Sequence, residues 1–162
     1  SGQVEIRAVR MRDVQSGEAR WHFHAGDEVE IEVDYEILSP VNELVFGIGI
    51  VRADGLDVHG TNTDIDSVQA PIPSDTALEK FPLRGRYQYK ISKLELTENT
   101  YYLDVAIHKQ DGVPFDYHHR MHQFSVRSAR ASTGVYTPEH SWNFICEYEA
   151  KPSKADSVER AA

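Results

Sequence analysis

The sequence predicts an all-β domain, an antiparallel β-sandwich of the immunoglobulin-like kind. Apolar and polar residues alternate over several segments, which is the period of strands with one buried face. Turn residues such as Gly, Pro, Asn and Asp separate these segments, and no segment has the apolar spacing of an amphipathic helix. About seven to nine such strands in a chain of 162 residues are typical of a β-sandwich.

The first part of the chain is expected to form four strands. A strand over residues 4–11 is followed by the most regular alternation, Glu28 to Leu38, where the acidic residues predict an acidic outer face. The next strand begins at Leu44. Asp54-Gly55 then favours a tight hairpin that returns along residues 56–59, before a polar loop over residues 60–64.

The second part begins with a long loop, Thr61 to Leu83, which contains three prolines. Three further strands are expected over residues 87–96, 101–109 and 121–127. A loop is expected at 110–117, between the last two. A linker of small residues, 128–133, leads to a final extended segment at 134–145 that carries Trp142.

Composition indicates one domain over residues 1–150 and a polar tail at 151–162. The net charge of −9 argues against a nucleic-acid surface and against docking on an anionic membrane. No apolar run approaches the ~20 residues of a membrane span. The single cysteine, Cys146, excludes an intrachain disulfide and fits a reducing compartment. Because the chain starts with Ser-Gly, we expect the natural protein to extend further towards the N-terminus.

The strands that contain Leu44, Tyr101 and Met121 are expected to be neighbours in one sheet. If their apolar residues point into the core, the alternate residues face solvent. That outward set is Val45, Gly47, Gly49, Val51, Tyr102, Asp104, Ala106, His108, Gln123, Ser125 and Arg127. Paired glycines beside an aromatic ring and planar polar groups suit a sugar ligand. Composition alone favours the simpler interpretation, an ordinary solvated sheet face.

A cluster of histidines raises the possibility of a metal site. The residues concerned are His108, His118, His119 and His122, with Asp111 and Asp116. Imidazole and carboxylate groups bind zinc or iron, but His118 and His119 would point to opposite faces of a strand, and no known ligand motif is present. We therefore expect structural or surface histidines and neither metal nor cofactor. An alternative is that Asp116, His118 or His119 contacts a sugar from a loop.

Catalytic motifs are not found in the sequence. It contains neither a phosphate-binding GxxxxGK[ST] loop nor a GxSxG nucleophile motif. Cys146 follows the last regular segment with no base nearby in sequence, so an inert thiol is expected. Carboxylates that share a face, such as Glu30 and Glu32, could serve glycoside hydrolysis but more often serve solubility. We expect a protein without catalytic activity.

Four segments together resemble the C-terminal domain of the Wzt family, the ATP-binding subunits of O-antigen polysaccharide ABC exporters. They are FGIGI with DG and VHGTNT between Leu44 and Asp64, FHAGD at 23–27, Leu94 to Ile107, and Gly134 to Trp142. Their order and spacing extend over residues 4–142. Asn99 stands where the family usually has Gly, a mild departure because Asn tolerates the left-handed conformation.

The resemblance implies a non-catalytic, carbohydrate-binding domain for the lipopolysaccharide O-antigen, which would recognise the modified non-reducing end of the polysaccharide for export. It implies a homodimer, an ATPase domain elsewhere in the full-length protein, a transmembrane transporter subunit as partner, and a cytoplasmic location at the inner membrane. It also makes part of the outward set the expected carbohydrate contacts. These are Gly47, Gly49, Tyr102, Asp104, His108, Gln123, Ser125 and Arg127.

Three alternatives stay open from the sequence. The domain could be a protein-interaction β-sandwich of a larger protein, or a metal-dependent enzyme built on the histidines. The segment 134–145 could be exchanged between two protomers or could pack on its own chain.

Overall fold

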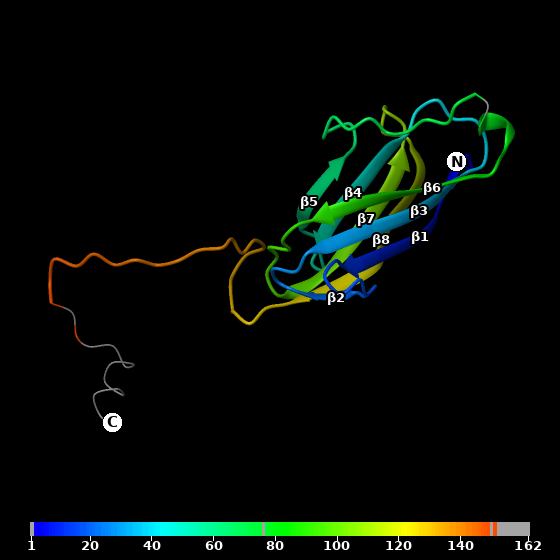
Figure 1. Ribbon diagram of the computed structural model, residues 1–162. Coiled ribbons are helices and arrows are strands. Elements are labelled where there is room, and N and C mark those ends of the chain that lie inside the picture. Colours follow the sequence, from blue (N-terminus) through cyan, green and yellow to red (C-terminus); the bar gives the residue numbers. More distant parts are fainter. Residues whose placement is uncertain (1, 76, 150, 152–162) are drawn as a thin grey trace.

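Two β-sheets packed face to face form the protein in the computed structural model, which describes residues 2–75, 77–149 and 151 (Figure 1). The strands are β1 (Val4–Asp13), β2 (His22–His24), β3 (Val29–Ile37), β4 (Val45–Arg52), β5 (Asp57–Asn62), β6 (Leu83–Ile91), β7 (Asn99–His108) and β8 (Pro114–Arg127). A 3₁₀ turn, η1 (Ala77–Glu79), precedes β6. One sheet has the order β1-β3-β6, and the other has the order β2-β8-β7-β4-β5. The predicted fold class, an immunoglobulin-like antiparallel β-sandwich, is confirmed, although the short β2 joins β8 in parallel.

The core consists of the apolar residues that alternation assigned to the inner faces. On β7 the residues Tyr101, Leu103, Val105 and Ile107 are completely buried, and the odd residues of β3 are buried likewise. The Tyr35, Phe46 and Tyr87 rings join the two sheets, with centroids 5.1 Å apart for Tyr35–Phe46 and 4.7 Å for Phe46–Tyr87. Such aromatic contacts stabilise a core by more than the burial of their surface alone would. The inward phase of β4 and β7 is therefore as predicted.

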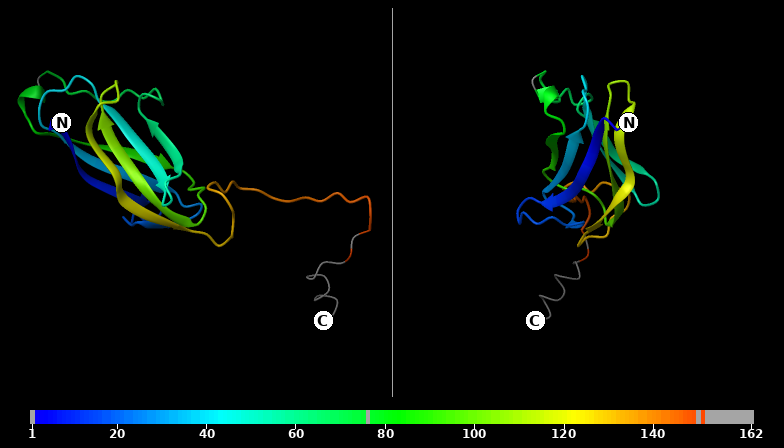
Figure 2. Two further views of the ribbon diagram at one scale, coloured as in Figure 1. Left: turned by 180° about the vertical axis from the view of Figure 1, so that it is seen from behind. Right: turned by 90° about the vertical axis from the view of Figure 1, so that its right-hand side faces the viewer.

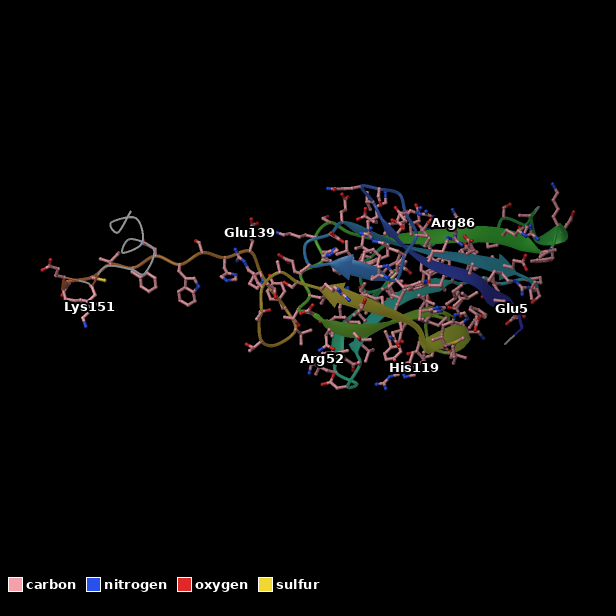
Figure 3. The ribbon with its side chains drawn as sticks, turned by 90° about the horizontal axis from the view of Figure 1, so that it is seen from below. Glu5, Arg52, Arg86, His119, Glu139 and Lys151 are labelled. Atoms are coloured by element: carbon pink, nitrogen blue, oxygen red, sulfur yellow. The ribbon has the colours of Figure 1, made fainter. Side chains whose placement is uncertain are left out.

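The acidic side chains of β3 lie on its outer face as predicted, but that face is not acidic overall, because its carboxylates lie between two rows of basic side chains. Asp34 accepts hydrogen bonds from Arg10 of β1 at 2.7 Å and from Arg86 of β6. Glu32, 3% exposed, bonds Arg12 at 2.9 Å. Arg86 lies on the opposite outer face of the sandwich from Arg52 and His119 (Figure 3). The basic partners come from strands far away in sequence, so alternation within β3 could not reveal them.

Three strand boundaries also differ from the prediction. Gly60–Asn62 belongs to β5 because it continues to pair with β4, and residues 114–117, expected as a loop, open β8 by pairing with β7. The strand expected at 87–96 lies at 83–91, paired along the whole of β3. In each case the pairing with a neighbouring strand sets the boundary, because the sequence pattern is weak there.

The long strand β8 contains a bulge next to its middle. Leu103 pairs with His122 and Val105 pairs with His118, so three residues of β8 span what one residue of β7 spans. Arg120, within the bulge, has a φ of 53°, in the left-handed region that favours glycine. Its backbone N–H donates to Asp104 Oδ1 at 2.8 Å, and this contact from β7 holds the bulge.

The C-terminal segment leaves the sandwich after a short stretch of contacts, which includes the ion pair between Lys93 and Glu139 at 3.0 Å. Tyr136 forms an isolated bridge to Leu96, and Thr97 donates its backbone N–H to the carbonyl of Val135 at 3.0 Å. Beyond these contacts the chain extends away from the sheets without forming the expected strand, and Trp142 is 82% exposed (Figure 2). Of the predicted tail, residues 152–162 lie outside the described residues. Within the described part of the chain, no helix has the length and apolar character needed to cross a membrane.

Replacing Phe46 with Ala is expected to lower the free energy of unfolding by about 3–5 kcal/mol, because the ring fills the space between the sheets and would leave a cavity. Urea unfolding followed by circular dichroism measures this. Val113→Ala, at a side chain that is exposed in the β7–β8 turn, is the control and should change stability by less than about 0.5 kcal/mol. A loss under about 1 kcal/mol for Phe46→Ala would contradict the inward phase of β4.

Candidate functional site: a groove on the outer face of the five-stranded sheet

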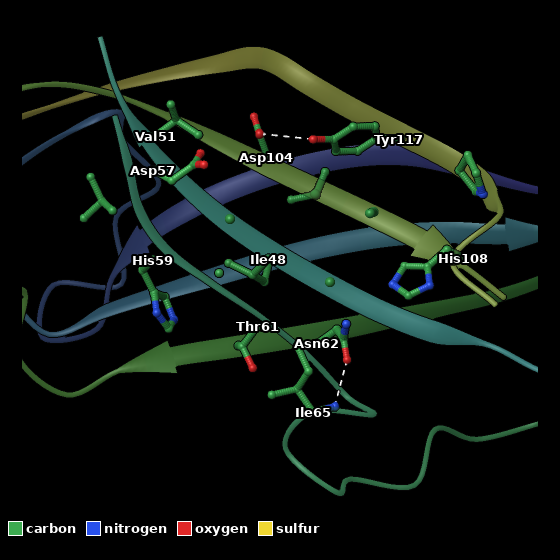
Figure 4. A pocket seen from close by; sticks show the side chains of 18 residues that line it. Ile48, Val51, Asp57, His59, Thr61, Asn62, Ile65, Asp104, His108 and Tyr117 are labelled. Carbon is green, nitrogen blue, oxygen red and sulfur yellow. Dashed lines mark hydrogen bonds between the residues drawn. The ribbon is translucent and has the colours of Figure 1, made fainter. Parts of the chain in front are cut away.

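A groove of about 740 Å³ lies on the outer face of the five-stranded sheet, where β5, β4, β7 and β8 run side by side (Figure 4). Its floor is formed by Gly47 and Gly49 of β4 and by Ala106 of β7. Gly47 pairs with Ala106, and Gly49 pairs with Asp104. A run of residues with little or no side chain leaves main-chain groups open to a ligand.

The glycines are not required by crowding or by an unusual backbone conformation. A Cβ atom built on Gly49 would lie 3.4 Å from the Cβ of Asp104, and one built on Gly47 would lie 3.6 Å from that of Ala106. Both are ordinary contact distances, so alanine would fit at either position, whereas a longer side chain would extend into the groove. Neither crowding nor backbone conformation therefore explains the two glycines, and both glycines leave the floor of the groove open.

Asp104 lies in the groove wall and is almost completely buried, with 7% of its surface exposed. Its Oδ2 atom accepts hydrogen bonds from the Tyr117 hydroxyl at 3.3 Å and from the His119 ring at 2.8 Å, and its Oδ1 accepts the Arg120 N–H. A buried carboxylate needs such partners to offset its lost hydration. Asp104 thus positions the residues around it and has little capacity left for a ligand.

Tyr117 supplies the aromatic ring of the groove. It lies on β8 opposite Ala106, lines the groove, and keeps 49% of its surface exposed. Burial, with the negative charge of Asp104, raises the pKa of its hydroxyl, so this hydroxyl stays a donor. Tyr117 is absent from the expected contacts because the sequence pattern predicts a loop at 110–117. Asp111-Gly112, the same turn motif as Asp54-Gly55, could have indicated that a strand follows immediately.

The opposite rim of the groove comes from β5 and the turn after it. His59 Nε2 and the Tyr89 hydroxyl are 2.8 Å apart, and this hydrogen bond joins the edge of β5 to the edge of β6. The Asn62 side chain accepts the Ile65 N–H at 2.8 Å and holds the Ile65 side chain beside the groove (Figure 4). Beneath the floor, the Tyr87 hydroxyl donates to the carbonyl of Gly47 at 3.3 Å. The groove is thus supported from both sheets.

The expected carbohydrate contacts divide into two sets. Gly47, Gly49, Asp104 and His108 line the groove. Tyr102, Gln123, Ser125 and Arg127 face the same side of the sheet but lie outside the groove, towards the β2 edge. Two of the expected outward residues, Val45 and Val51, are buried.

Two of the four histidines, His118 and His122, form a separate cluster on the inner side of β8. His118 Nδ1 and His122 Nε2 are 3.0 Å apart, and the His122 ring stacks on Trp21 at 5.8 Å. Asp116, expected in a loop, accepts the backbone N–H of Ile6 at 2.8 Å and so joins β8 to β1. His108 lies apart from them at the end of β7, bonded to the carbonyl of Lys109. No three His, Cys, Asp or Glu side chains among residues 2–75, 77–149 and 151 are grouped to hold a metal ion.

Comparisons with known proteins agree on one family. The sequence model of the Wzt C-terminal domain matches residues 1–138. The O-antigen export system ATP-binding protein RfbB of Myxococcus xanthus is 25% identical over 141 residues, which are 87% of this chain and 29% of that protein. The chain therefore spans less than a third of the length of this relative.

A solved structure supports the fold. A crystal structure of the C-terminal domain of Wzt matches with a TM-score of 0.76 and 16% identity, over 90% of this chain and 86% of that chain. An immunoglobulin-like protein from Pseudomonas aeruginosa matches with a TM-score of 0.37 and 14% identity, over 78% of this chain and all of that one.

Lowering the pH from 7 to 5 is expected to reduce the free energy of unfolding through His122. Burial, and then the neighbouring His118, hold the pKa of His122 below its ordinary value of 6.5, while Asp104 opposes this. The folded state thus favours the neutral ring. The contribution of His122 to stability is therefore fully present above its ordinary pKa and is lost as the pH falls through its pKa in the folded state.

Urea unfolding at both pH values measures this effect. His122→Gln should lose less stability between pH 7 and pH 5 than the unchanged chain loses. The carboxylates whose pKa values are lowered by basic partners, such as Asp34, lose their contribution at lower pH and do not obscure the comparison. An equal loss in both chains would contradict the assignment to His122.

Proposed function

Because the chain belongs to the family of Wzt C-terminal domains, we propose that it is a non-catalytic carbohydrate-recognition domain that binds O-antigen polysaccharide in the groove. The observation that carries this proposal is the glycine floor beside the exposed Tyr117 ring. The glycan would be bound through its modified non-reducing end. A groove on one face of the sheet can enclose the end of a polysaccharide while the rest of the polysaccharide extends into solvent.

The chemistry of the groove suits a sugar ring. The C–H face of a pyranose packs on an aromatic ring such as Tyr117, and its hydroxyls pair with planar polar groups. The Asn62 amide on one rim and the His108 ring on the other can supply such groups. The exposed main chain at Gly47 and Gly49 allows the ring to approach closely.

Binding without hydrolysis fits the carboxylates of the groove. Among the described residues that line it, the acidic side chains are Asp57 and Asp104. Asp104 already accepts three hydrogen bonds, so it is poorly suited to act as the acid or the nucleophile. Glycoside hydrolysis needs two available carboxyl groups on either side of the bond to be cleaved. The groove therefore favours recognition over catalysis.

The wider role follows from the family. The full-length protein would contain an ATPase domain, would act with a transmembrane transporter subunit, and would lie on the cytoplasmic side of the inner membrane. The relative named as an O-antigen export ATP-binding protein, of which this chain spans 29%, supports this arrangement. The domain would then present the glycan to the transporter, and the energy for export would come from the ATPase domain.

A homodimer joined through the C-terminal segment is part of the proposal. Trp142, Phe144, Ile145 and Tyr148 are all exposed in one chain, Ile145 at 92%. Apolar side chains at this density on an extended segment favour packing against a partner. Exchange of such a segment between identical chains forms a dimer at low cost, since both chains gain the same contacts.

The groove is tested by Tyr117→Ala and Gly49→Leu. Loss of the ring should weaken polysaccharide binding by about 1–3 kcal/mol, by analogy with other stacking contacts, and the leucine side chain should fill the groove and abolish binding. Isothermal titration calorimetry with purified O-polysaccharides of defined end groups measures both effects.

Each variant has a matched control. Tyr117→Phe keeps the ring and should bind nearly as well, and Gly49→Ala adds one Cβ that fits at ordinary contact distance and should also bind. Circular dichroism establishes that all four variants fold. Unchanged affinity in folded Tyr117→Ala and Gly49→Leu would place the glycan elsewhere.

The dimer is tested by truncation after His140. This variant keeps the bridge from Tyr136 to Leu96 and the ion pair between Lys93 and Glu139, but it removes the exposed apolar residues. Sedimentation at tens of micromolar should give a dimer for the whole chain and a monomer for the truncated chain. If the whole chain sediments as a monomer, the exchange is wrong.

A further inference from the structure

A second hollow, of about 470 Å³, lies at the β2 edge of the same sheet. We call it the β2–β8 hollow. It is lined by Glu18, Arg20, His22, Phe23, His24, Ser125 and Arg127. Phe23 and Val126 are buried, so the neighbours of these two residues along each strand face outward, on the side of the sheet that carries the groove.

The parallel pairing of β2 with β8 brings polar side chains together in two rows. His22 pairs with Ser125, and His24 pairs with Arg127. Paired residues on adjacent strands lie about 5 Å apart, and every second residue along a strand shares a face. Two imidazoles, a hydroxyl and a guanidinium can therefore point towards one small ligand. Each of them can donate a hydrogen bond.

The charge in the hollow is not balanced at Arg127. Arg20 is shared among three carboxylates, those of Asp27 at 3.3 Å, Asp13 at 3.4 Å and Glu18 at 3.6 Å. Arg127, in contrast, has no ion pair or side-chain hydrogen bond with any residue of the described part of the chain. A guanidinium without an ion pair attracts an anion at short range, and other hydrogen-bond donors lie beside it. The net charge of −9 of the whole chain opposes this attraction at longer range.

We propose that the β2–β8 hollow binds an anionic group, a phosphate or a carboxylate, carried by the glycan that occupies the groove. Arg127 would contact two of its oxygen atoms side by side, the geometry that guanidinium groups prefer with phosphate and carboxylate. Ser125 and the two histidines would donate to the remaining oxygens. The anion contact stands on its own geometry, and only the assignment of the anion to the glycan rests on the proposed function.

The position of the hollow favours a ligand that also reaches the groove. From Gly49 to His22 the sheet is crossed over three strand spacings and about four residues along the strands, a separation of about 20 Å. Tyr102 and Gln123, which pair with each other, lie on the outward face between the two sites. An extended oligosaccharide can cover this path with its end in the groove. The four predicted contacts that lie outside the groove thereby acquire a role.

Anion binding is tested with inorganic phosphate, glucose 6-phosphate, glucuronate and uncharged glucose, added to the ¹⁵N-labelled chain. The amide resonances of residues 22–24 and 125–127 should shift and saturate with the three anions and stay unchanged with glucose. Tighter binding of the phosphates or of glucuronate identifies the preferred group. Absence of a saturable shift with every anion would overturn the proposal.

The role of Arg127 is tested with two matched variants. Arg127→Gln should weaken anion binding about tenfold or more, the loss expected when a charge-assisted hydrogen bond is removed. Arg130→Gln removes another exposed arginine three residues further along the chain, outside the hollow, and should leave binding unchanged. An equal loss in both variants would mean general attraction by positive charge and would overturn the site.

The link to the glycan is tested with an O-polysaccharide that carries anionic groups and with the same polymer after their removal. Arg127→Gln should weaken the first about tenfold and leave the second unchanged. If neither polymer shifts the resonances of Gly47 and Gly49 while the small anions still bind, the proposed function fails and the hollow remains. If both polymers bind the groove and Arg127→Gln has no effect on either, the hollow is wrong and the proposed function remains.

Discussion

The packing of the apolar face of β4 against the other sheet organises the structure. Phe46, Ile48 and Ile50 must point into the core, because exposing them would forfeit roughly 1.5–3 kcal/mol for each side chain. Side chains alternate along a strand, so this burial turns Gly47 and Gly49 outward. A shift of one residue would expose the whole apolar set, which makes the register strongly specified. The groove therefore exists because the core is packed correctly beneath it.

Asp104 connects the floor of the groove to its wall. As a buried carboxylate it needs several donors, and it finds them in Tyr117, His119 and the backbone of Arg120, all on β8. These contacts fix a bulge that the backbone alone would disfavour at Arg120. They also hold the Tyr117 ring beside the glycines. A residue first considered as a sugar contact thus acts by positioning the aromatic ring that we propose makes the contact.

The outer faces of the two sheets differ in how their polar groups are used. On the three-stranded sheet, carboxylates and basic side chains are paired with one another. Burial alone would raise the pKa of Glu32, but hydrogen bonds from Arg12 and Gln88 outweigh it and hold that pKa below its ordinary value. On the five-stranded sheet, the side chains of Arg127, His22 and His24 form no ion pair or hydrogen bond with another residue of the described part of the chain, which leaves them available to other partners. A face whose polar side chains are paired with one another is suited to solubility. A face with available hydrogen-bond donors beside a groove is suited to binding.

The amino-acid sequence was sufficient to predict the fold class, the inward phase of β3, β4 and β7, and the outward position of Gly47, Gly49, Asp104 and His108. These follow from period-two alternation, which is a local property of each strand. The fold, and not the local pattern, places Tyr117 instead of Tyr102 in the groove, because residues 114–117 pair with β7 and Asp104 accepts a hydrogen bond from the Tyr117 hydroxyl. The hollow at Arg127 likewise depends on the parallel pairing of β2 with β8. The pairing of β2 with β8 joins segments that are far apart in sequence, and no local pattern records it.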